Sequence, residues 1–453
     1  MRLFNCFNKG FTYLNYLLFS LAIVLSNKAF TQDARYDEPT LDALSLEELM
    51  NIPLNTDYSK HQIYQSDINP IDENTINFGL IVPISQFPLY SAEVVAAADL
   101  ATLHINNNGG ILGNRLAILR ADDYENTPVS AALAQRLATE FNVKALLGPA
   151  TSDSVADVLQ KVAIPNNIPL ISHAASTMAL TEIGGQHAFW RMVANNAQQV
   201  ELMFNFLLKK TNHRNVYIIS GRELYSEEIR SGLIEKFKQA KETQINYYAV
   251  SNLVRIESMD LEDEIKAIQS SGATAIVMTV QNAQVIPMIN KIKKHWNGPF
   301  PMILLGDNVT PKYLTDASLG KISECIMTYV ASPKELSNEL KRNMKKKLKF
   351  ETAMFDAAYI YDATILLAMG LEISEFFNIP VKTAIESITA DGYAINHDDY
   401  SNILTLVKKH KELSFTGYSG RVHFNGTGDN LAASMTIYPI VHSEQAPDCL
   451  KNR

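Results

Sequence analysis

Short apolar segments alternate with helix-like segments along most of the chain, and this alternation restricts the possible folds more than any other feature. A first series of apolar segments has the length and composition of buried parallel strands, at residues 76–82, 116–120, 145–147 and 169–171. A second series follows Arg191, at residues 216–220, 245–250, 275–280 and 302–305. Two series of this kind predict an α/β protein with two doubly wound parallel-sheet lobes.

The segments between these strands have helical periodicity. Residues 91–106 place Val94, Ala98, Ala101 and Ile105 on one side, which predicts an amphipathic helix. Further helices are predicted at 227–238, 261–270 and 285–295. Three more, at 334–349, 352–371 and 381–388, follow one another without intervening strands.

Composition excludes some classes of function. The chain has 453 residues, of which 47% are hydrophobic and 19% charged, so it can bury a large core but is too long for one ordinary domain. The formal net charge of −8 gives no general basic field, and the densest basic run, at 341–349, has a helical pattern typical of a solvated face. We therefore expect no nucleic-acid partner.

The first thirty residues have the features of a targeting segment. Arg2 and Lys9 precede an apolar run at 11–25, which is shorter than a membrane span requires. We expect a signal peptide at 1–30, cleavage after it, and a soluble periplasmic protein; an uncleaved anchor is the alternative. Cys6 lies before the apolar run, so it is not the acylated cysteine of a lipoprotein.

Residues 31–74 are polar, acidic and interrupted by prolines, which indicates an extension with one helical piece near 41–51. Residues 44–52 resemble a short segment found near the mature amino terminus of TonB-dependent outer-membrane receptors. The resemblance implies an envelope partner that docks through 41–52. The alternative is an amphipathic helix that Ser45 caps, with Glu48 completing a capping box.

Two hydroxyl-rich turns follow neighbouring predicted strands. Residues 151–154 begin a helix that ends at Pro165, and residues 172–177 follow the strand at 169–171. Because the carboxyl ends of parallel strands meet at one edge of a sheet, both turns should open there. The first turn offers hydroxyl groups and backbone N–H groups to an anion, so the pair can hold a carboxylate.

These two turns resemble those of the leucine/isoleucine/valine-binding protein family, periplasmic receptors that supply amino acids to ABC importers. Other stretches of the chain, in the same order and at similar spacing, are also similar to family signatures: residues 91–114, 189–191, 355–363 and 415–424. The resemblance covers about 76–440. It implies a type I periplasmic-binding fold in which two lobes close on a ligand about a three-segment hinge.

The resemblance also implies where the lobes begin and end. Lobe 1 is expected at 75–192 and 332–420, lobe 2 at 193–331 and 421–445, and a tail at 446–453. The three connecting segments should then lie near Met192, Tyr329 and Arg421.

For the ligand carboxylate, the family positions correspond to Ser152, to the backbone of Ala174 and to the hydroxyl of Ser176. Both serines could instead serve only as a helix cap and a turn bond. Such a ligand also needs an acidic acceptor for its ammonium and an apolar wall.

Tyr225 corresponds to the aromatic residue that covers the ligand from lobe 2, with an exposed ring beside a helix start as the alternative. Tyr90 corresponds to an aromatic residue at the cleft entrance, where Phe87 could serve instead. Asp307 is the available carboxylate for the ligand's ammonium, although the best-known members use a longer Glu; Gln281 is a weaker candidate.

The sequence gives little support for an enzyme. It lacks a Gly-x-Ser-x-Gly motif, a His-Glu-x-x-His motif, and a Gly-x-Gly-x-x-Gly turn after a strand. His173 is the one histidine near the expected cleft, and a lone turn histidine is usually structural. We expect no catalysis, cofactor or metal. Cys325 and Cys449 remain after removal of the leader and either form a disulfide or stay free.

Together, these features predict an extracytoplasmic solute-binding protein. Its expected ligand is a branched-chain or other apolar amino acid, and its expected partner is the permease of an ABC importer in the inner membrane. One alternative is a periplasmic sensor of an amino acid or amide that signals to a membrane receptor or regulator. A second alternative is a docking protein that has lost its ligand.

Overall fold

The computed structural model describes residues 63–65, 75–250, 256–307, 309, 319–331, 336–349, 355–440 and 449. The predicted signal peptide at 1–30, the helical piece near 41–51 and the expected docking segment at 41–52 lie outside the described residues. So do the extension at 31–74, except residues 63–65, and the tail at 446–453, except Cys449.

Lobe 1 is built on a six-stranded sheet whose order is β1-β3-β2-β4-β5-β6. Its strands are β1 (Ile63–Gln65), β2 (Thr75–Val82), β3 (Arg115–Asp122), β4 (Ala145–Leu147), β5 (Leu170–Ser172) and β6 (Phe189–Arg191). Strands β2 to β6 pair in parallel; β2 to β5 were predicted, whereas β6 was not. Strand β1 pairs antiparallel with β3 and was not predicted, because three residues are too few to show a periodicity.

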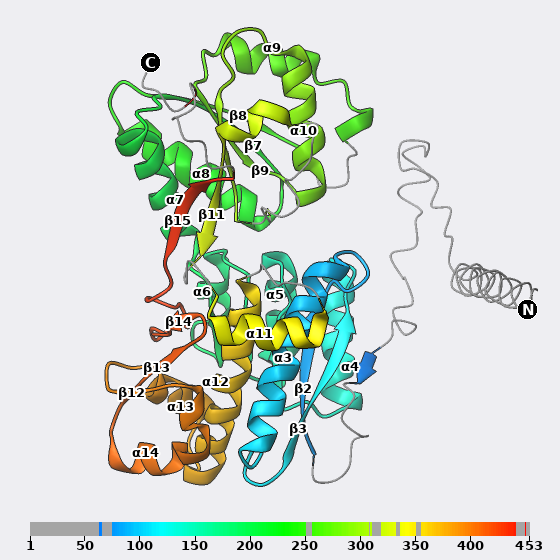
Figure 1. Ribbon diagram of the computed structural model, residues 1–453, viewed down its shortest axis with the longest axis vertical. Coiled ribbons are helices and arrows are strands. Elements are labelled where there is room, and N and C mark those ends of the chain that lie inside the picture. The colour runs from blue at the N-terminus through cyan, green and yellow to red at the C-terminus, as the bar shows by residue number, and fades with distance from the viewer. Residues whose placement is uncertain are drawn as a thin grey trace, which may run out of the picture. The chain divides into compact units, whose positions relative to one another are not determined.

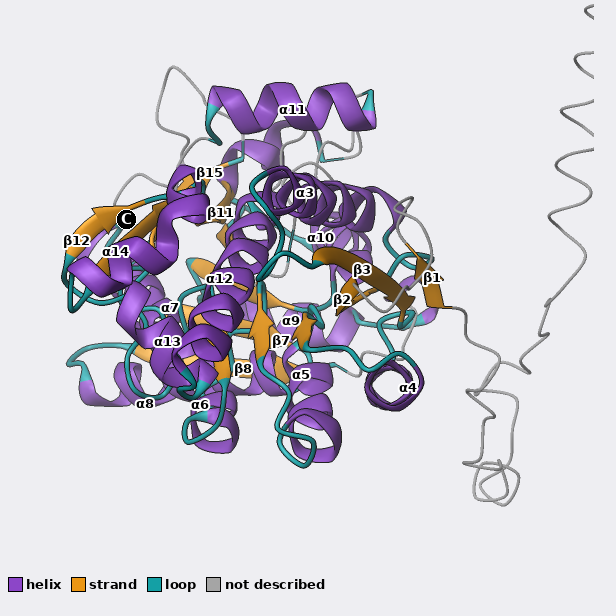
Figure 2. Ribbon diagram, turned by 90° about the horizontal axis from the view of Figure 1, so that it is seen from below, coloured by secondary structure: helices purple, strands orange, loops and turns teal. Residues whose placement is uncertain are grey.

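Helices cover both faces of this sheet. One face packs against α3 (Pro88–Asn107), α11 (Asn338–Leu348), α12 (Asp356–Phe377) and α13 (Val381–Ile388). The other face packs against α4 (Thr127–Glu140), α5 (Ser152–Val158) and the π-helical turn η3 (Leu159–Ala163). Figure 2 shows α3 and α12 side by side, with α4 on the opposite side of β2 and β3. Burial on both faces explains why these strands are almost continuously apolar.

The later part of lobe 1 adds helix α14 (Ile403–Lys409) and a small sheet of β12 (Tyr393–Ile395), β13 (Leu413–Gly417) and β14 (Gly420–Arg421). Helix α12 is long and apolar enough to cross a membrane, but 83% of its apolar window is buried inside the protein. Its hydrophobicity therefore reflects its place at the centre of the lobe 1 core.

Lobe 2 is built on a second six-stranded sheet, with the order β15-β11-β10-β9-β7-β8. Its strands are β7 (Asn215–Ser220), β8 (Gln244–Ala249), β9 (Ala275–Thr279), β10 (Met302–Leu305), β11 (Ile326–Ala331) and β15 (Met435–Pro439). All neighbours pair in parallel except β15, which is antiparallel to β11.

The lobe 2 sheet is also covered on both faces. Helices α7 (Asn196–Phe204) and α8 (Leu224–Gln239), with the π-helical turn η4 (Asn205–Lys210), pack on one face. Helices α9 (Glu262–Ser270) and α10 (Asn282–His295) pack on the other. Figure 1 shows α7 to α10 gathered around β7, β8 and β9, and α3, α4 and α11 gathered around β2 and β3. The two-lobed, doubly wound fold predicted from sequence is thus confirmed.

The chain passes between the two sheets three times: after β6, after β11 and after β14. The first and third connections are bonded to each other, because Asn430 Nδ2 donates to the Met192 carbonyl at 2.9 Å and Arg191 N donates to the Gly428 carbonyl at 3.0 Å. Arg191 is fully buried, and its Nε lies 2.7 Å from Asp429 Oδ1. The residue boundaries of the lobes remain a prediction.

Cys325 and Cys449 form a disulfide, with their Cα atoms 5.9 Å apart. The bridge joins the start of β11 to a residue near the carboxyl terminus, 124 positions later in the chain. Of the two alternatives that the sequence left open, the structure has the bridged one.

Candidate functional site

The predicted ligand-binding residues lie in the loops and helix starts that follow the carboxyl ends of parallel strands. Tyr90 follows β2, Ser152 follows β4, and Ala174 and Ser176 follow β5 in lobe 1. In lobe 2, the corresponding positions after β7, β9 and β10 are those of Tyr225, Gln281 and Asp307. Ligands of open α/β sheets bind at this edge.

The two hydroxyl-rich turns of lobe 1 are in direct contact. Thr151 caps α5, with its Oγ1 accepting from Ser154 N at 3.4 Å, so Ser152 is the first helical residue and not the cap. The Ser152 hydroxyl oxygen instead accepts from Thr177 N at 3.3 Å and ties the first turn to the second. Ser176 is buried, and its carbonyl accepts from Asn196 N at 2.8 Å.

A glycine is required where the first turn leaves the sheet. Gly148 has a φ of +78°, and a Cβ atom at this position would lie 2.4 Å from the Ile81 carbonyl oxygen. Any side chain here would separate β2 from the turn after β4. The close approach of these two backbones places the turn that leads to Ser152 next to the end of β2, which is followed by helix α3 and its residue Tyr90.

Tyr90 contacts His173, which lies in the second turn. The Tyr90 hydroxyl and His173 Nε2 are 2.8 Å apart, and the two rings stack with centroids separated by 6.2 Å. His173 is fully buried, and burial lowers its pKa to about 4. The imidazole is therefore neutral at neutral pH and adds no positive charge to the site.

In lobe 2, Tyr225 and Asp307 meet at a third residue, Gln199 of α7. The Tyr225 hydroxyl donates to Gln199 Oε1 at 3.2 Å and accepts from Asp307 N at 3.0 Å. Gln199 Nε2 donates to Asp307 Oδ2 at 2.6 Å. These contacts fix the orientation of the Asp307 carboxylate, which the sequence analysis predicted to bind the ligand's ammonium group.

Gln281 occupies the N-cap position of α10 without capping it through its side chain. The contacts of the described residues do not join its side chain to the other candidates, and Ala174 is half-buried in its turn. The structure thus brings Tyr225 and Asp307 together and joins the Ser152 and Ser176 turns, whereas it gives Gln281 no comparable partner among these residues.

Carboxylates dominate the electrostatics at the strand ends. Burial, with the negative charges of Asp307 and Glu93, raises the pKa of Asp356 to about 7. Asp356 is half-buried at the start of α12. Burial, with Asp123 and Glu223, likewise raises the pKa of Glu125 to about 7. An added positive charge would favour the ionised forms of these groups.

Each of these two pKa shifts includes the effect of a negative charge in the other lobe. Asp307 of lobe 2 acts on Asp356 of lobe 1, and Glu223 of lobe 2 acts on Glu125 of lobe 1. Like charges repel, and a cationic group placed between them lowers that repulsion. Among the described residues, no group of three or more His, Cys, Asp or Glu is placed to hold a metal ion.

Sequence reasoning missed Gln199 and Asp356 as parts of this site. Asn196, Gln199 and Met203 share one buried side of α7. The sequence could have shown this, because the polar residues Asn196 and Gln199 are spaced to lie on the same helix face as the apolar Met203. Asp356 begins α12 within a stretch that had been identified only as a family signature. Its role depends on long-range proximity to Asp307, which local patterns do not report.

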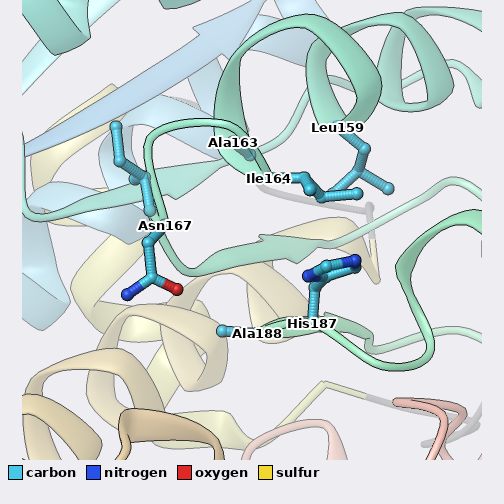
Figure 3. A pocket seen from close by; sticks show the side chains of 7 residues that line it. Leu159, Ala163, Ile164, Asn167, His187 and Ala188 are labelled. Atoms are coloured by element: carbon cyan, nitrogen blue, oxygen red, sulfur yellow. The ribbon is translucent and has the colours of Figure 1, made fainter.

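A small cavity elsewhere in lobe 1 is too small to be the ligand site. It is lined by Leu159, Ala163, Ile164, Asn167, Ile168, His187 and Ala188, which Figure 3 shows as sticks, with all but Ile168 labelled. These residues precede β5 and β6 and so lie at the amino ends of those strands, away from the predicted turns. Its free volume is about 10 Å³, room for one water molecule at most.

Relatives of known sequence match parts of the chain. The Leu/Ile/Val-binding protein BraC3 of Rhizobium johnstonii is 27% identical over 170 residues, which are 37% of this chain and 44% of that protein. The Leu/Ile/Val-binding protein homolog 3 of Brucella melitensis is 25% identical over 206 residues, 44% of this chain and 53% of that protein. The chain thus spans about half the length of the curated relatives it matches. Glutamate receptor 2.5 of Arabidopsis thaliana is 22% identical over 78% of this chain and 39% of that protein.

Solved structures share the fold. The substrate-binding protein LivJ of Streptococcus pneumoniae, in complex with isoleucine, aligns with a TM-score of 0.60 at 20% identity, over 80% of this chain and 95% of that one. The leucine-binding protein LivK of Thermotoga maritima aligns with a TM-score of 0.62 at 19% identity, over 80% and 94%. A solute-binding protein of an ABC transporter from R. palustris, in complex with benzoate, aligns with a TM-score of 0.60 at 15% identity, over 81% and 93%.

The family comparison covers both lobes. Residues 75–443 match the model of a periplasmic binding protein family, which agrees with the two sheets, the three connections between them and the solved structures of the same fold. The chain therefore belongs to the periplasmic binding protein family and has its two-lobed type I fold.

Proposed function

We propose that this protein is an extracytoplasmic solute-binding protein that closes on a small amino-acid-like ligand and delivers it to an ABC importer. The observation that carries the proposal is the arrangement at the strand ends of the two lobes. Joined hydroxyl-rich turns in lobe 1 suit a carboxylate, and the oriented Asp307 of lobe 2, in a strongly acidic setting, suits an ammonium group. A ligand with both groups can bridge the lobes.

In this proposal, each predicted residue has a stated role. Ser152, the backbone of Ala174 and Ser176 hold the ligand carboxylate, whereas Asp307 accepts from the ammonium. Tyr225 forms the lobe 2 wall. Tyr90 stands at the entrance, and Gln281 is a secondary polar contact.

The proposal includes the setting of the protein. It is exported to the periplasm by a cleaved signal peptide at 1–30, and its partner is an inner-membrane permease. An envelope component that binds through 41–52 is a further proposed partner. The protein binds its solute without transforming it, so it is not an enzyme. These statements rest on the targeting features of the sequence and on the family's role in solute binding.

The proposed contact between Asp307 and the ligand's ammonium group distinguishes two classes of ligand. Amino acids carry this group, whereas an aromatic acid such as benzoate has a carboxylate but no ammonium. Calorimetry should detect binding of L-leucine or L-isoleucine to the native protein. Asp307→Asn should weaken that binding at least tenfold, since it removes the charge of a charge-assisted hydrogen bond worth about 1.5–3 kcal/mol. Asp263→Asn is the matched control, because Asp263 is exposed on α9.

The outcomes are distinct. Binding of L-leucine with a selective loss in Asp307→Asn supports the proposal. Binding of benzoate but of no amino acid would replace the amino-acid ligand by an aromatic acid, and equal losses for charged and uncharged ligands would show that Asp307 has a folding role.

Sensing is the second candidate function. It is favoured by the match to a protein named as a glutamate receptor, which covers 78% of this chain at 22% identity. Both functions use the same cleft and the same closure. Neighbouring genes separate them: permease and ATPase genes support transport, whereas a kinase or cyclase gene supports sensing.

A further inference from the structure

Glu228, in the second turn of α8, connects lobe 2 to the ligand turn of lobe 1. Its carboxylate accepts from Met178 N at 2.8 Å, from Ala179 N at 3.2 Å and from the Thr177 hydroxyl. It also accepts from Asn196 Nδ2 at 2.8 Å, beside the first connection between the lobes. All of these partners are donors, so the site requires an acceptor with several lone pairs.

This contact completes a helix cap that lobe 1 provides only in part, through Thr177 Oγ1, which accepts from Ala179 N at 3.4 Å. Helix α6 (Ala179–Gly184) begins after Met178, which makes no side-chain cap. The N–H groups at the start of a helix lack partners within the helix, and here Glu228 accepts from two of them.

Lobe 1 provides the reciprocal contact. Glu223, at the N-cap position of α8, makes no side-chain cap to that helix. Asp153, in the first turn of α5, accepts from Leu224 N at 3.3 Å. In each lobe, a carboxylate therefore accepts hydrogen bonds from backbone N–H groups at the start of a helix in the other lobe.

The turn that Glu228 holds is the one that carries Ser176. Besides its bond to Glu228, Thr177 donates its N–H to Ser152 Oγ, and its carbonyl accepts from Arg191 Nη1 at 2.6 Å. The turn is thus fixed by α5, by the buried arginine at the connection, and by lobe 2. Tyr225 lies three residues before Glu228 on α8, so both side chains occupy neighbouring positions on one helix face.

We propose that Glu228 is a positioning residue that fixes the ligand turn of lobe 1 from lobe 2 and thereby couples ligand binding to the relative position of the lobes. The part that concerns the ligand rests on the proposed function. When α8 moves, the turn that carries Ser176 must move with it or lose its bonds to Glu228. Tyr225 and the Ser176 turn therefore reach their binding positions together.

The first test needs no ligand. Glu228→Gln keeps the size of the side chain but places an NH2 group against donors, whereas Glu227→Gln changes the adjacent, exposed residue that pairs with Arg230. Hydrogen exchange followed by mass spectrometry should show faster exchange at Met178 and Ala179 in Glu228→Gln, by about tenfold, with native protection in Glu227→Gln. Equal exchange in the two variants would overturn the proposed contact.

The second test measures coupling, with L-leucine as the probe. Glu228→Gln should bind it about tenfold more weakly than Glu227→Gln, and small-angle scattering should show a smaller ligand-dependent decrease in the radius of gyration. Native affinity in Glu228→Gln would overturn the positioning role. If the native protein does not bind L-leucine, the proposed ligand fails, while the exchange experiment still decides whether Glu228 joins the lobes.

A pair of variants at Thr177 protects the test against loss of folding in Glu228→Gln. Thr177→Val removes the hydroxyl that donates to Glu228, and Thr177→Ser restores it. We expect faster exchange at Met178 and weaker L-leucine binding in Thr177→Val, with recovery of both in Thr177→Ser. The same behaviour in the two Thr177 variants would contradict the proposal.

Discussion

At the scale of single residues, one hydroxyl can serve the fold and the ligand together. Ser152 Oγ accepts from Thr177 N, which uses one of its lone pairs and leaves the geometry of its own proton open. Thr151 and not Ser152 caps α5, so the cap alternative posed by the sequence does not apply, whereas the bond from Ser152 to the second turn is compatible with ligand contact. Ser176 differs, because the bond that holds it in the turn comes from its carbonyl and not from its hydroxyl.

If both hydroxyls hold the ligand carboxylate, their joint removal should weaken binding strongly. We expect Ser152→Ala with Ser176→Ala to lower the affinity for L-leucine well over tenfold, since each charge-assisted bond contributes about 1.5–3 kcal/mol. Calorimetry measures the effect, and Ser231→Ala on the exposed side of α8 is the control. Unchanged affinity in the folded double variant would show that these hydroxyls only support the turns.

The raised pKa of Asp356 predicts a pH dependence of stability. The pKa is about 7 in the folded protein and 3.8 for the free side chain, so the folded state holds the proton more tightly. The contribution to stability is complete below about pH 4 and is lost as the pH rises through about 7. Between pH 5 and 8, the free energy of unfolding should fall for the native protein and fall less for Asp356→Asn.

Urea denaturation at several pH values tests this expectation. Between pH 5 and 8, the free energy of unfolding of the native protein should fall by on the order of a few kcal/mol at most more than that of Asp356→Asn, because one pKa unit corresponds to about 1.4 kcal/mol. Asp263→Asn, which changes an exposed carboxylate, should follow the native curve. Parallel curves for the native protein and Asp356→Asn would show that this carboxyl ionises normally in the fold.

At the scale of elements, the sequence predicted what is periodic. Eight of the strands were found because each is an apolar segment between helical patterns, and α13 was predicted at 381–388, the bounds it has in the structure. Strand β1 escaped because it is short and polar in its surroundings, and β6 because residues 189–191 form a brief apolar stretch between turns. Short elements owe their existence to a neighbouring strand and not to their own pattern.

The same reasoning explains which site residues the sequence could nominate. Ser152, Ser176, Tyr225 and Asp307 follow strands, so their positions come from local order in the chain. Gln199 and Glu228 act through partners that lie far away in sequence: Gln199 bonds to Asp307, 108 positions later, and Glu228 bonds to Ala179, 49 positions earlier. Such pairs follow from the packing of one element against another, which no local pattern contains.

The disulfide is an element-scale device, because it ties a residue near the carboxyl terminus to the start of β11. It closes a long loop, and constraining the unfolded chain in this way stabilises proteins by about 2–4 kcal/mol. We expect Cys449→Ser to lower the free energy of unfolding by that amount. In urea denaturation, the native protein with a reductant and the double variant Cys325→Ser with Cys449→Ser should both have the same free energy of unfolding as Cys449→Ser. A native denaturation curve that a reductant does not change would contradict the expectation.

At the scale of the whole molecule, three connections between two rigid lobes favour movement by rotation. Each sheet is packed on both faces, so a lobe resists internal rearrangement, whereas the segments between the sheets are few. Asp307 and Glu223 of lobe 2 contribute to the raised pKa values of Asp356 and Glu125 of lobe 1, and a ligand that carries a positive charge would favour the ionised forms of these two groups. A ligand can shift the lobes only through contacts that differ between the open and closed states.

This reasoning predicts that L-leucine, if it is the ligand, decreases the radius of gyration without changing the secondary structure. Small-angle scattering and circular dichroism measure the two quantities. Tyr225→Ala should abolish the decrease, because a ligand held by lobe 1 alone gains nothing from the closed state and cannot shift the population toward it.

The matched variant Tyr225→Phe keeps the ring but removes the hydroxyl that contacts Gln199 and Asp307, so it should close less completely than the native protein and more completely than Tyr225→Ala. A native protein that binds L-leucine with an unchanged radius of gyration would show that binding does not drive closure, and the delivery mechanism proposed for this protein would then lose its mechanical signal.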